Sequence, residues 1–186
     1  ISIVNGDANE NPYNFVLKGT GTTPEMNVQG NSTTIADGDT TAITGDHTAF
    51  GDVEVVGGSV TRTFTIQNTG TGVLNLGADS VTIGGTGFAL EGAQPATTVA
   101  SGANVTFQVK FDPSVAGAVT GTVSIASDDA DENPYNYSIS ATGLIPEINL
   151  QGNSQSIVSG DVLPTTTDHT DFGAHDITGG TQTRTF

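Results

Sequence analysis

Two copies of an acidic loop hold the residues best suited to bind a metal ion. One reads SDDADENPYN from Ser127 to Asn136, and the other reads NGDANENPYN from Asn5 to Asn14. Calcium takes six to eight oxygen ligands, drawn from carboxylates, amide oxygens and backbone carbonyls. The sequence therefore offers a candidate Ca²⁺ site with the ligands Asp128, Asp129, Asp131, Glu132 and Asn133, and a weaker copy at Asp7, Asn9, Glu10 and Asn11.

The alternative is that each loop is only the turn between two strands. Gly6 and Asn9 stand where the richer loop has Asp128 and Asp131, so the second copy loses part of its negative charge. Asp, Asn and Pro favour turns, and a residue before proline is pushed out of the helical region. The spacing of an EF-hand is also missing. A plain hairpin loop is therefore the favoured interpretation, and calcium binding is the alternative.

A second polar segment, DGDTTAITGDHT from Asp37 to Thr48, returns in part as GDVLPTTTDHT from Gly160. It supplies carboxylates and a single histidine, His47, which falls short of the three or four ligands usual for zinc. Local bonds from Asp side chains to their own backbone are the favoured interpretation. The carboxylates concerned are Asp37, Asp39 and Asp46 in the first copy, and Asp161 and Asp168 in the second.

The sequence contains no recognisable catalytic motif. There is no G-x-S-x-G nucleophile elbow, and the glycine-rich GGTG at Gly84 lacks the lysine and helix of a phosphate loop. The sequence therefore predicts that the protein is not an enzyme and needs no cofactor, Ca²⁺ excepted. Tyr135 is expected in the core at a strand start. Arg62 is expected at the rim of the fold, with an ion pair to a nearby carboxylate as a testable addition.

Charge and composition exclude several classes of partner. Four basic residues face twenty acidic ones, which gives a formal net charge of −16 and makes nucleic acid and anionic membrane surfaces poor partners. No cysteine is present, so disulfides and thiolate metal sites are excluded. No run approaches the length and hydrophobicity needed to span a bilayer, so direct membrane insertion is not expected.

An internal repeat organises the chain. ENPYN at Glu10 returns at Glu132, PEMNVQGNS at Pro24 returns as PEINLQGNS at Pro146, and TRTF at Thr61 returns at Thr183, each offset by 122 residues. Each copy is of ordinary domain size. We expect one complete repeat at residues 24–143, the closing strands of a preceding repeat at 1–21, and the opening strands of a following repeat at 146–186, so that the chain lies within a longer tandem array.

Alternating apolar residues predict that each repeat is an immunoglobulin-like β-sandwich. In VTFQVKF the side chains of Val105, Phe107, Val109 and Phe111 share one face, and TFTIQN, VTGTVSI and YNYSISA follow the same period of two. Abundant glycine and threonine argue against long helices. Seven or more short strands with turn signals between them are typical of this all-β fold.

Several segments resemble a known family. PEMNVQGN, TRTFTIQNTGTGVLNL, VTFQVKFDPSVAGAVTGTVSIASDD and DENPYNYSISATG are similar to the choice-of-anchor D repeats of bacterial secreted and surface proteins. Those repeats are in turn similar to the immunoglobulin-like modules of the abnormal-spindle, SPD and hydin group. The resemblance implies a sandwich used as a repeated spacer or adhesive module, located outside the cell or on a bacterial cell surface, without catalytic residues.

Two functions stay open at this point. The first is a structural repeat that acts as a spacer or filament segment, with neighbouring repeats and copies of the same protein as its partners. The second is an adhesin module that binds a glycan, a host or surface protein, or ice. A glycan binder usually exposes an aromatic platform, whereas this chain has no tryptophan and three tyrosines, all near the NPYN motifs. The structural role is therefore favoured.

Overall fold

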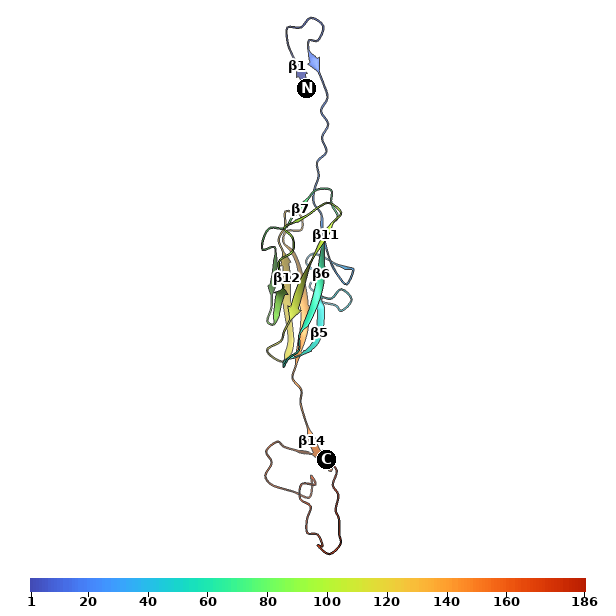
Figure 1. Cartoon of the computed structure of the whole chain (residues 1–186), viewed down its shortest axis with the longest axis vertical. Helices are drawn as coiled ribbons and strands as arrows, with labels where there is room; N and C mark the ends of the chain where they lie inside the picture. The colour runs from blue at the N-terminus through green and yellow to red at the C-terminus, as the bar shows by residue number, and fades with distance from the viewer. The chain divides into compact units, whose positions relative to one another are not determined.

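The computed structural model describes residues 1–186 and contains strands but no helices. It divides into two compact units, Ile1–Leu144 and Ile145–Phe186. The strands of a complete two-sheet sandwich run from Met26 to Leu144 in the first unit, as Figure 1 shows. The predicted fold class, an all-β immunoglobulin-like sandwich, is confirmed. The assignment of residues 1–21 and 146–186 to neighbouring repeats stays a prediction.

The first sheet of the sandwich has five strands in the order β4-β3-β6-β11-β9. Each pair of neighbours in it is antiparallel. The strands are β3 (Met26–Gly30), β4 (Thr33–Ile35), β6 (Val60–Asn68), β9 (Phe88–Glu91) and β11 (Asn104–Phe111).

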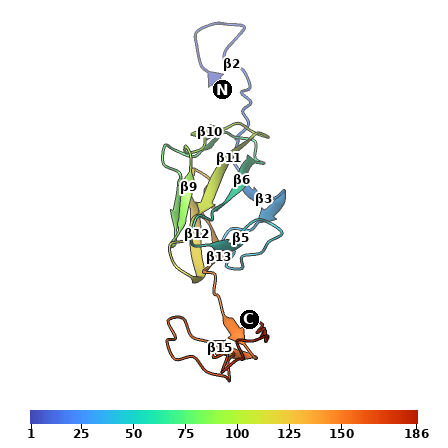
Figure 2. The ribbon, with the colours of Figure 1, turned by 60° about the horizontal axis from the view of Figure 1, so that its bottom comes forward.

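The second sheet has four strands in the order β5-β13-β12-β8. They are β5 (Ala49–Glu54), β8 (Val81–Gly84), β12 (Gly117–Ile125) and β13 (Tyr135–Leu144). β13 pairs with β12 in antiparallel register and with β5 in parallel register, with a shift in the register between Ser140 and Thr142. A short ladder of β7 (Leu74–Asn75) and β10 (Thr98–Val99) lies beside β11 at one end of the sandwich (Figure 2).

The core lies between the two sheets and follows the alternation that the sequence predicts. Phe64 and Ile66 of β6 are fully buried, and so are Ile125 of β12 and Ile139 of β13. Their neighbours along each strand are partly or fully exposed, as expected for side chains that alternate across a pleated strand. Val105 and Val119 were expected inside as well, but they are only partly buried because they lie toward strand ends.

The chain enters and leaves the sandwich at opposite ends. Met26 at the start of β3 donates its backbone N–H to Asp129, in the loop that precedes β13. Leu144, the last residue of β13, pairs instead with Glu54 at the other end of that strand. Ten strand residues separate these two ends, which corresponds to about 30 Å.

The outer segments repeat parts of this architecture. β1 (Ser2–Ile3) and β2 (Tyr13–Asn14) pair Ile3 with Tyr13, as β12 and β13 pair Ile125 with Tyr135. β14 (Leu150–Gly152) and β15 (Gln155–Ile157) pair in the register of β3 and β4. Their apolar side chains are largely exposed, in contrast to the equivalent residues of the complete sandwich.

Candidate functional site

Side-chain bonds to the backbone shape both acidic loops in the same way. In the loop between β12 and β13, Asn133 Oδ1 accepts a hydrogen bond from Ser127 N at 3.2 Å, and Asp129 N donates to Ser127 Oγ at 3.1 Å. In the N-terminal copy, Asn11 Oδ1 accepts from Asn5 N at 3.1 Å and Asp7 N donates to Asn5 Oδ1 at 2.6 Å. The turn geometry is therefore common to both copies, independent of their difference in charge.

Two of the candidate calcium ligands hold the loop in place. Asp128 accepts hydrogen bonds from the backbone N–H of Asn75 at 2.8 Å and from its side-chain amide, which ties the loop to β7. These bonds lower the pKa of Asp128 below its usual value, because they stabilise the ionised form. Asn133 is occupied by the bond to Ser127. Both side chains therefore have a structural task that requires no metal ion.

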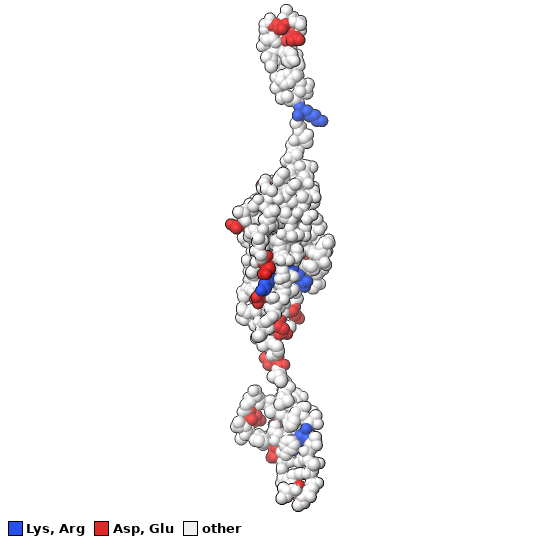
Figure 3. Space-filling view, in the orientation of Figure 1, with Lys and Arg blue, Asp and Glu red and all other residues white.

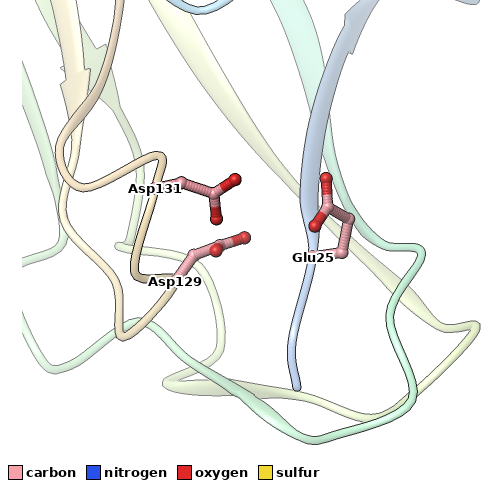
Figure 4. A group of neighbouring side chains, drawn as sticks. All are labelled: Glu25, Asp129 and Asp131. Atoms are coloured by element: carbon pink, nitrogen blue, oxygen red, sulfur yellow. The ribbon is translucent and has the colours of Figure 1, made fainter.

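Three carboxylates converge beside the loop. Glu25, Asp129 and Asp131 each have an oxygen atom within 4.8 Å of the others. Figure 4 shows Asp129 and Asp131 on the loop, facing Glu25 on the segment that leads into β3. Asp129 is 2% exposed, and its Oδ2 accepts the backbone N–H of Met26 at 2.6 Å. Carboxylate oxygens at this spacing are suited to a hard divalent cation such as Ca²⁺.

Glu25 is the residue that the sequence analysis missed. It lies more than a hundred positions from the loop, and the segment before β3 meets the loop where Met26 N donates to Asp129 Oδ2. One signal was available, because its glutamate returns in the repeat as Glu147. Of the five residues predicted for the richer loop, Asp129 and Asp131 join Glu25, whereas Asp128 and Asn133 bond elsewhere. The N-terminal copy retains Asp7 and has Asn9 in place of the second aspartate.

Glu132 lies close to this cluster and is electrostatically strained. Its Oε2 atom is buried and has no hydrogen-bond partner. Burial, followed by the negative charges of Asp129, Glu25, Asp37 and Asp131, raises the pKa of Glu132 from 4.5 to about 7. A bound cation would relieve this repulsion, whereas without one the carboxyl group keeps its proton to a higher pH than an ordinary glutamate does.

This shift predicts that the first unit, freed of metal by a chelator, is more stable at pH 5 than at pH 8. The folded state holds the Glu132 proton more tightly than the unfolded chain does, so stability falls as the pH rises from about 4.5 to about 7. Solvent screening reduces the effect, and we expect a loss of about 1 kcal/mol. Denaturant unfolding of the wild type and of Glu132→Gln at both pH values measures it. An equal pH dependence in the variant would contradict the assignment.

Most carboxylates of the second polar segment bond to residues close to them in the sequence. Asp46 is buried, and its Oδ1 accepts from Thr48 N at 3.0 Å and from Thr48 Oγ1 at 2.6 Å. Asp168 makes the same two bonds with Thr170, and these bonds lower its pKa. The predicted local role is confirmed for these two carboxylates, and also for Asp39 and Asp161, which accept from Thr41 N and Leu163 N. It is wrong for Asp37, whose Oδ1 accepts from Asn136 N of β13 at 2.7 Å because this segment lies beside the start of that strand. His47 has a backbone φ of 68° and a buried Nδ1 without a partner.

Arg62 forms no ion pair. Its Nη2 donates to the carbonyl oxygen of Phe50 at 3.5 Å, and its Nε is buried without a partner. The ion pair present in the sandwich joins Lys110 Nζ and Asp112 Oδ2 at 2.9 Å. The predicted ion pair of Arg62 is wrong because its cross-strand neighbour on β11 is the apolar Val109, so no carboxylate lies opposite.

The predicted core role of Tyr135 is confirmed. Its ring is 2% exposed and its hydroxyl donates to the carbonyl oxygen of Ile35. Tyr137 is buried as well, and its ring lies 5.5 Å from that of Phe64. Burial raises the pKa of Tyr135 to about 12. Neither Tyr135 nor Tyr137 is therefore available as a stacking platform for a ligand.

The topology and core described above define the class of the first unit as an immunoglobulin-like sandwich domain. A family model matches residues 45–133 of the chain: that of the ASH family, abnormal spindle-like microcephaly-assoc'd, ASPM-SPD-2-Hydin. The expected similarity to this group is confirmed for that segment. The finer assignment to choice-of-anchor D repeats stays a prediction.

Solved structures provide more distant likenesses. A protein of unknown function from Porphyromonas gingivalis W83 aligns with a TM-score of 0.47 and 19% identity, over 64% of this chain and 47% of that one. The secreted serine protease VesC from Vibrio cholerae has a TM-score of 0.43 and 19% identity, over 54% and 22%. The ASH/PapD-like domain 7 of human CEP192 has a TM-score of 0.43 and 10% identity, over 73% and 97%.

The chain therefore spans less than half the length of the first two of these proteins. No curated protein matches the sequence. None of the chain's elements is a helix with the length and hydrophobicity to cross a bilayer.

Proposed function

We propose that this chain is a non-catalytic structural segment of an extracellular or bacterial cell-surface protein or filament, in which successive sandwiches act as spacers. One observation carries the proposal: the chain enters the complete sandwich beside Asp129 and leaves it at Leu144, at the opposite end of β13. Each such repeat adds the length of its long strands to the chain. The match to the ASH family supports a structural or interaction module.

The partners that fit this role are neighbouring repeats and further copies of the chain. The net charge of −16 disfavours nucleic acid and anionic lipid. On the face drawn in Figure 3, basic side chains are few and separate, so they form no continuous stripe for a phosphate backbone. The burial of Tyr135 and Tyr137 also disfavours a glycan platform on the sandwich.

Immunogold labelling of intact producing cells tests the spacer role. Antibodies against residues 24–143 should label material outside the cell envelope, and deletion of one repeat should bring an epitope at the far end of the protein closer to the envelope. Label confined to the cell interior would contradict the location. An unchanged epitope distance would contradict the spacer. Capture of one defined glycan or surface protein by the purified chain would instead favour the adhesin function.

We also propose that the first unit binds Ca²⁺ through Glu25, Asp129 and Asp131. The observation that favours this second role is the convergence of three carboxylates from two separate segments, with the strained Glu132 beside them. A cation there would join the loop before β13 to the segment before β3. Calcium would in this way stiffen the place where the chain enters the sandwich.

Thermal unfolding with calcium and with a chelator checks this site. We expect millimolar calcium to raise the melting temperature of the first unit by several degrees, since a ligand bound only to the folded state stabilises it. Glu25→Gln should remove most of that rise. The matched control is Glu54→Gln, which alters a carboxylate at the opposite end of the sandwich. Superimposable wild-type curves, or an equal loss in both variants, would contradict the site.

A further inference from the structure

Strand β8 is an open edge of the second sheet. It pairs with β12 on one side and has no strand on the other. Just before it, Ser80 O accepts from Ala126 N at 2.9 Å. Because backbone groups alternate in direction along an antiparallel strand, those of Val81 and Ile83 point away from β12. Unpaired groups of this kind are a template on which another strand can add.

The other three edges of the two sheets carry features that disfavour strand addition. β5 bends at Gly51, which has a φ of 84°, and it exposes Asp52 and Glu54. β4 is three residues long, and β9 exposes Glu91. A short length, an irregular backbone and charged side chains all hinder pairing between edges. β8 reads VTIG, with three β-branched residues and neither a charge nor a bend, so its sequence favours pairing.

The side chain of Gln94 occupies the open side of β8. Its Oε1 accepts the backbone N–H of Val81 at 3.0 Å, and its Nε2 donates to the backbone carbonyl of the same residue at 2.8 Å. A side-chain amide offers both an acceptor and a donor, so one group makes the two bonds that an added strand would make to Val81.

The loop around Gln94 holds it at this edge. Gln94 precedes Pro95, which restricts its backbone to extended conformations, and Pro95 is buried. Further along the loop, Thr97 O accepts from Leu76 N at 2.8 Å. A side chain presented from a fixed backbone loses less freedom when it bonds, so Gln94 competes well with an incoming strand.

We propose that Gln94 keeps the β8 edge closed to strand addition, and that the strand it excludes is β8 of a second copy of the repeat. Two such edges are self-complementary, because a two-fold axis between them aligns the free backbone groups of both strands in antiparallel register. A tandem array of repeats would hold many such edges at high local concentration. The proposal does not rest on the spacer role, and it leaves contacts between copies through other surfaces unchanged.

The test compares Gln94→Ala with the wild type in the 186-residue chain. In light scattering after size exclusion, the mass of Gln94→Ala should rise with concentration to at least twice that of the wild type at the same concentration. Hydrogen exchange reports on the edge directly. The amide of Val81 should be protected in the wild type, should exchange faster in the dilute variant, and should regain protection as the variant associates.

A second substitution tests whether β8 is the surface that pairs. Thr82 is exposed on β8, and Thr82→Lys adds a charge of the kind that blocks edge pairing. The double variant Gln94→Ala, Thr82→Lys should therefore return to the mass of the wild type. Failure of the added lysine to reverse the association would overturn the proposal.

Two controls separate edge pairing from other causes of association. Gln108→Ala removes an exposed glutamine that bonds Thr63 on an inner strand. Phe64→Ala weakens the core and leaves the Gln94 bonds in place, so it reports aggregation of unfolded chains. Both should keep the mass of the wild type below their melting temperatures. Equal growth in either control overturns the proposal, and so does a mass of Gln94→Ala that stays equal to that of the wild type.

Discussion

Replacing Phe64 with alanine is expected to lower the free energy of unfolding of the first unit by about 3–5 kcal/mol. Phe64 is fully buried and lies at the centre of the sandwich. Its ring stacks on Phe107 of the same sheet, with centroids 5.6 Å apart, and contacts Tyr137 of the opposite sheet at 5.5 Å. The cavity left by the ring would remove contacts to both sheets together.

Thermal and urea unfolding measure this loss, which corresponds to a fall of about 10–20 °C in melting temperature for a domain of this size. Thr61→Ala is the matched control, because Thr61 lies on the same strand with its side chain exposed. A loss in Phe64→Ala no greater than in the control would show that the two sheets do not depend on this ring. A changed slope in urea would instead indicate a change in the compactness of the unfolded chain.

Replacing Gly30 with alanine is expected to destabilise the same unit by about 3 kcal/mol, at the upper end of the usual cost of overpacking. A Cβ atom at this position would collide with the backbone carbonyl of Asp46 and would lie 3.1 Å from the Phe64 ring. Neither neighbour is free to move. The Asp46 turn is held by its bonds to Thr48, and Asn31 also ties it to β3 through Gly45 O at 3.0 Å.

Gly45→Ala provides the control for this substitution, since the nearest atom to a Cβ there is Ile43 Cδ1 at 3.8 Å, an ordinary contact. We expect that variant to unfold within about 0.5 kcal/mol of the wild type. Equal melting temperatures for Gly30→Ala and the wild type would mean that the Asp46 turn shifts freely. Gly152 faces the backbone carbonyl of Asp168 in the second unit in the same way.

Local periodicity made the fold predictable from the sequence. The alternation in VTFQVKF and YNYSISA identifies one buried face on each strand, and Phe107, Val109, Tyr135 and Ile139 are buried as it indicates. A strand's side-chain period is a local property, so no knowledge of its neighbours is needed. Tyr135 was placed correctly by the same argument.

The candidate site was predictable only in part because it depends on contacts distant in sequence. Glu25 approaches Asp131 only because β3 begins beside the loop that precedes β13. Composition cannot indicate that two distant segments lie side by side. It favoured Asp128 as a calcium ligand, whereas Asp128 accepts the backbone N–H of Asn75. The predicted ion pair of Arg62 was wrong for a related reason, because an acidic chain does not ensure that a carboxylate lies opposite a particular arginine.

The opposite placement of Met26 and Leu144 determines how the sandwich responds to tension. A pull on both ends acts along β3 in one sheet and along β13 in the other. β3 is held to β6 by five consecutive residue pairs, and β13 to β12 by nine. Because the force runs parallel to these strands, their hydrogen bonds share the load and must shear together instead of opening one after another. The same path that lengthens the chain therefore also resists its extension.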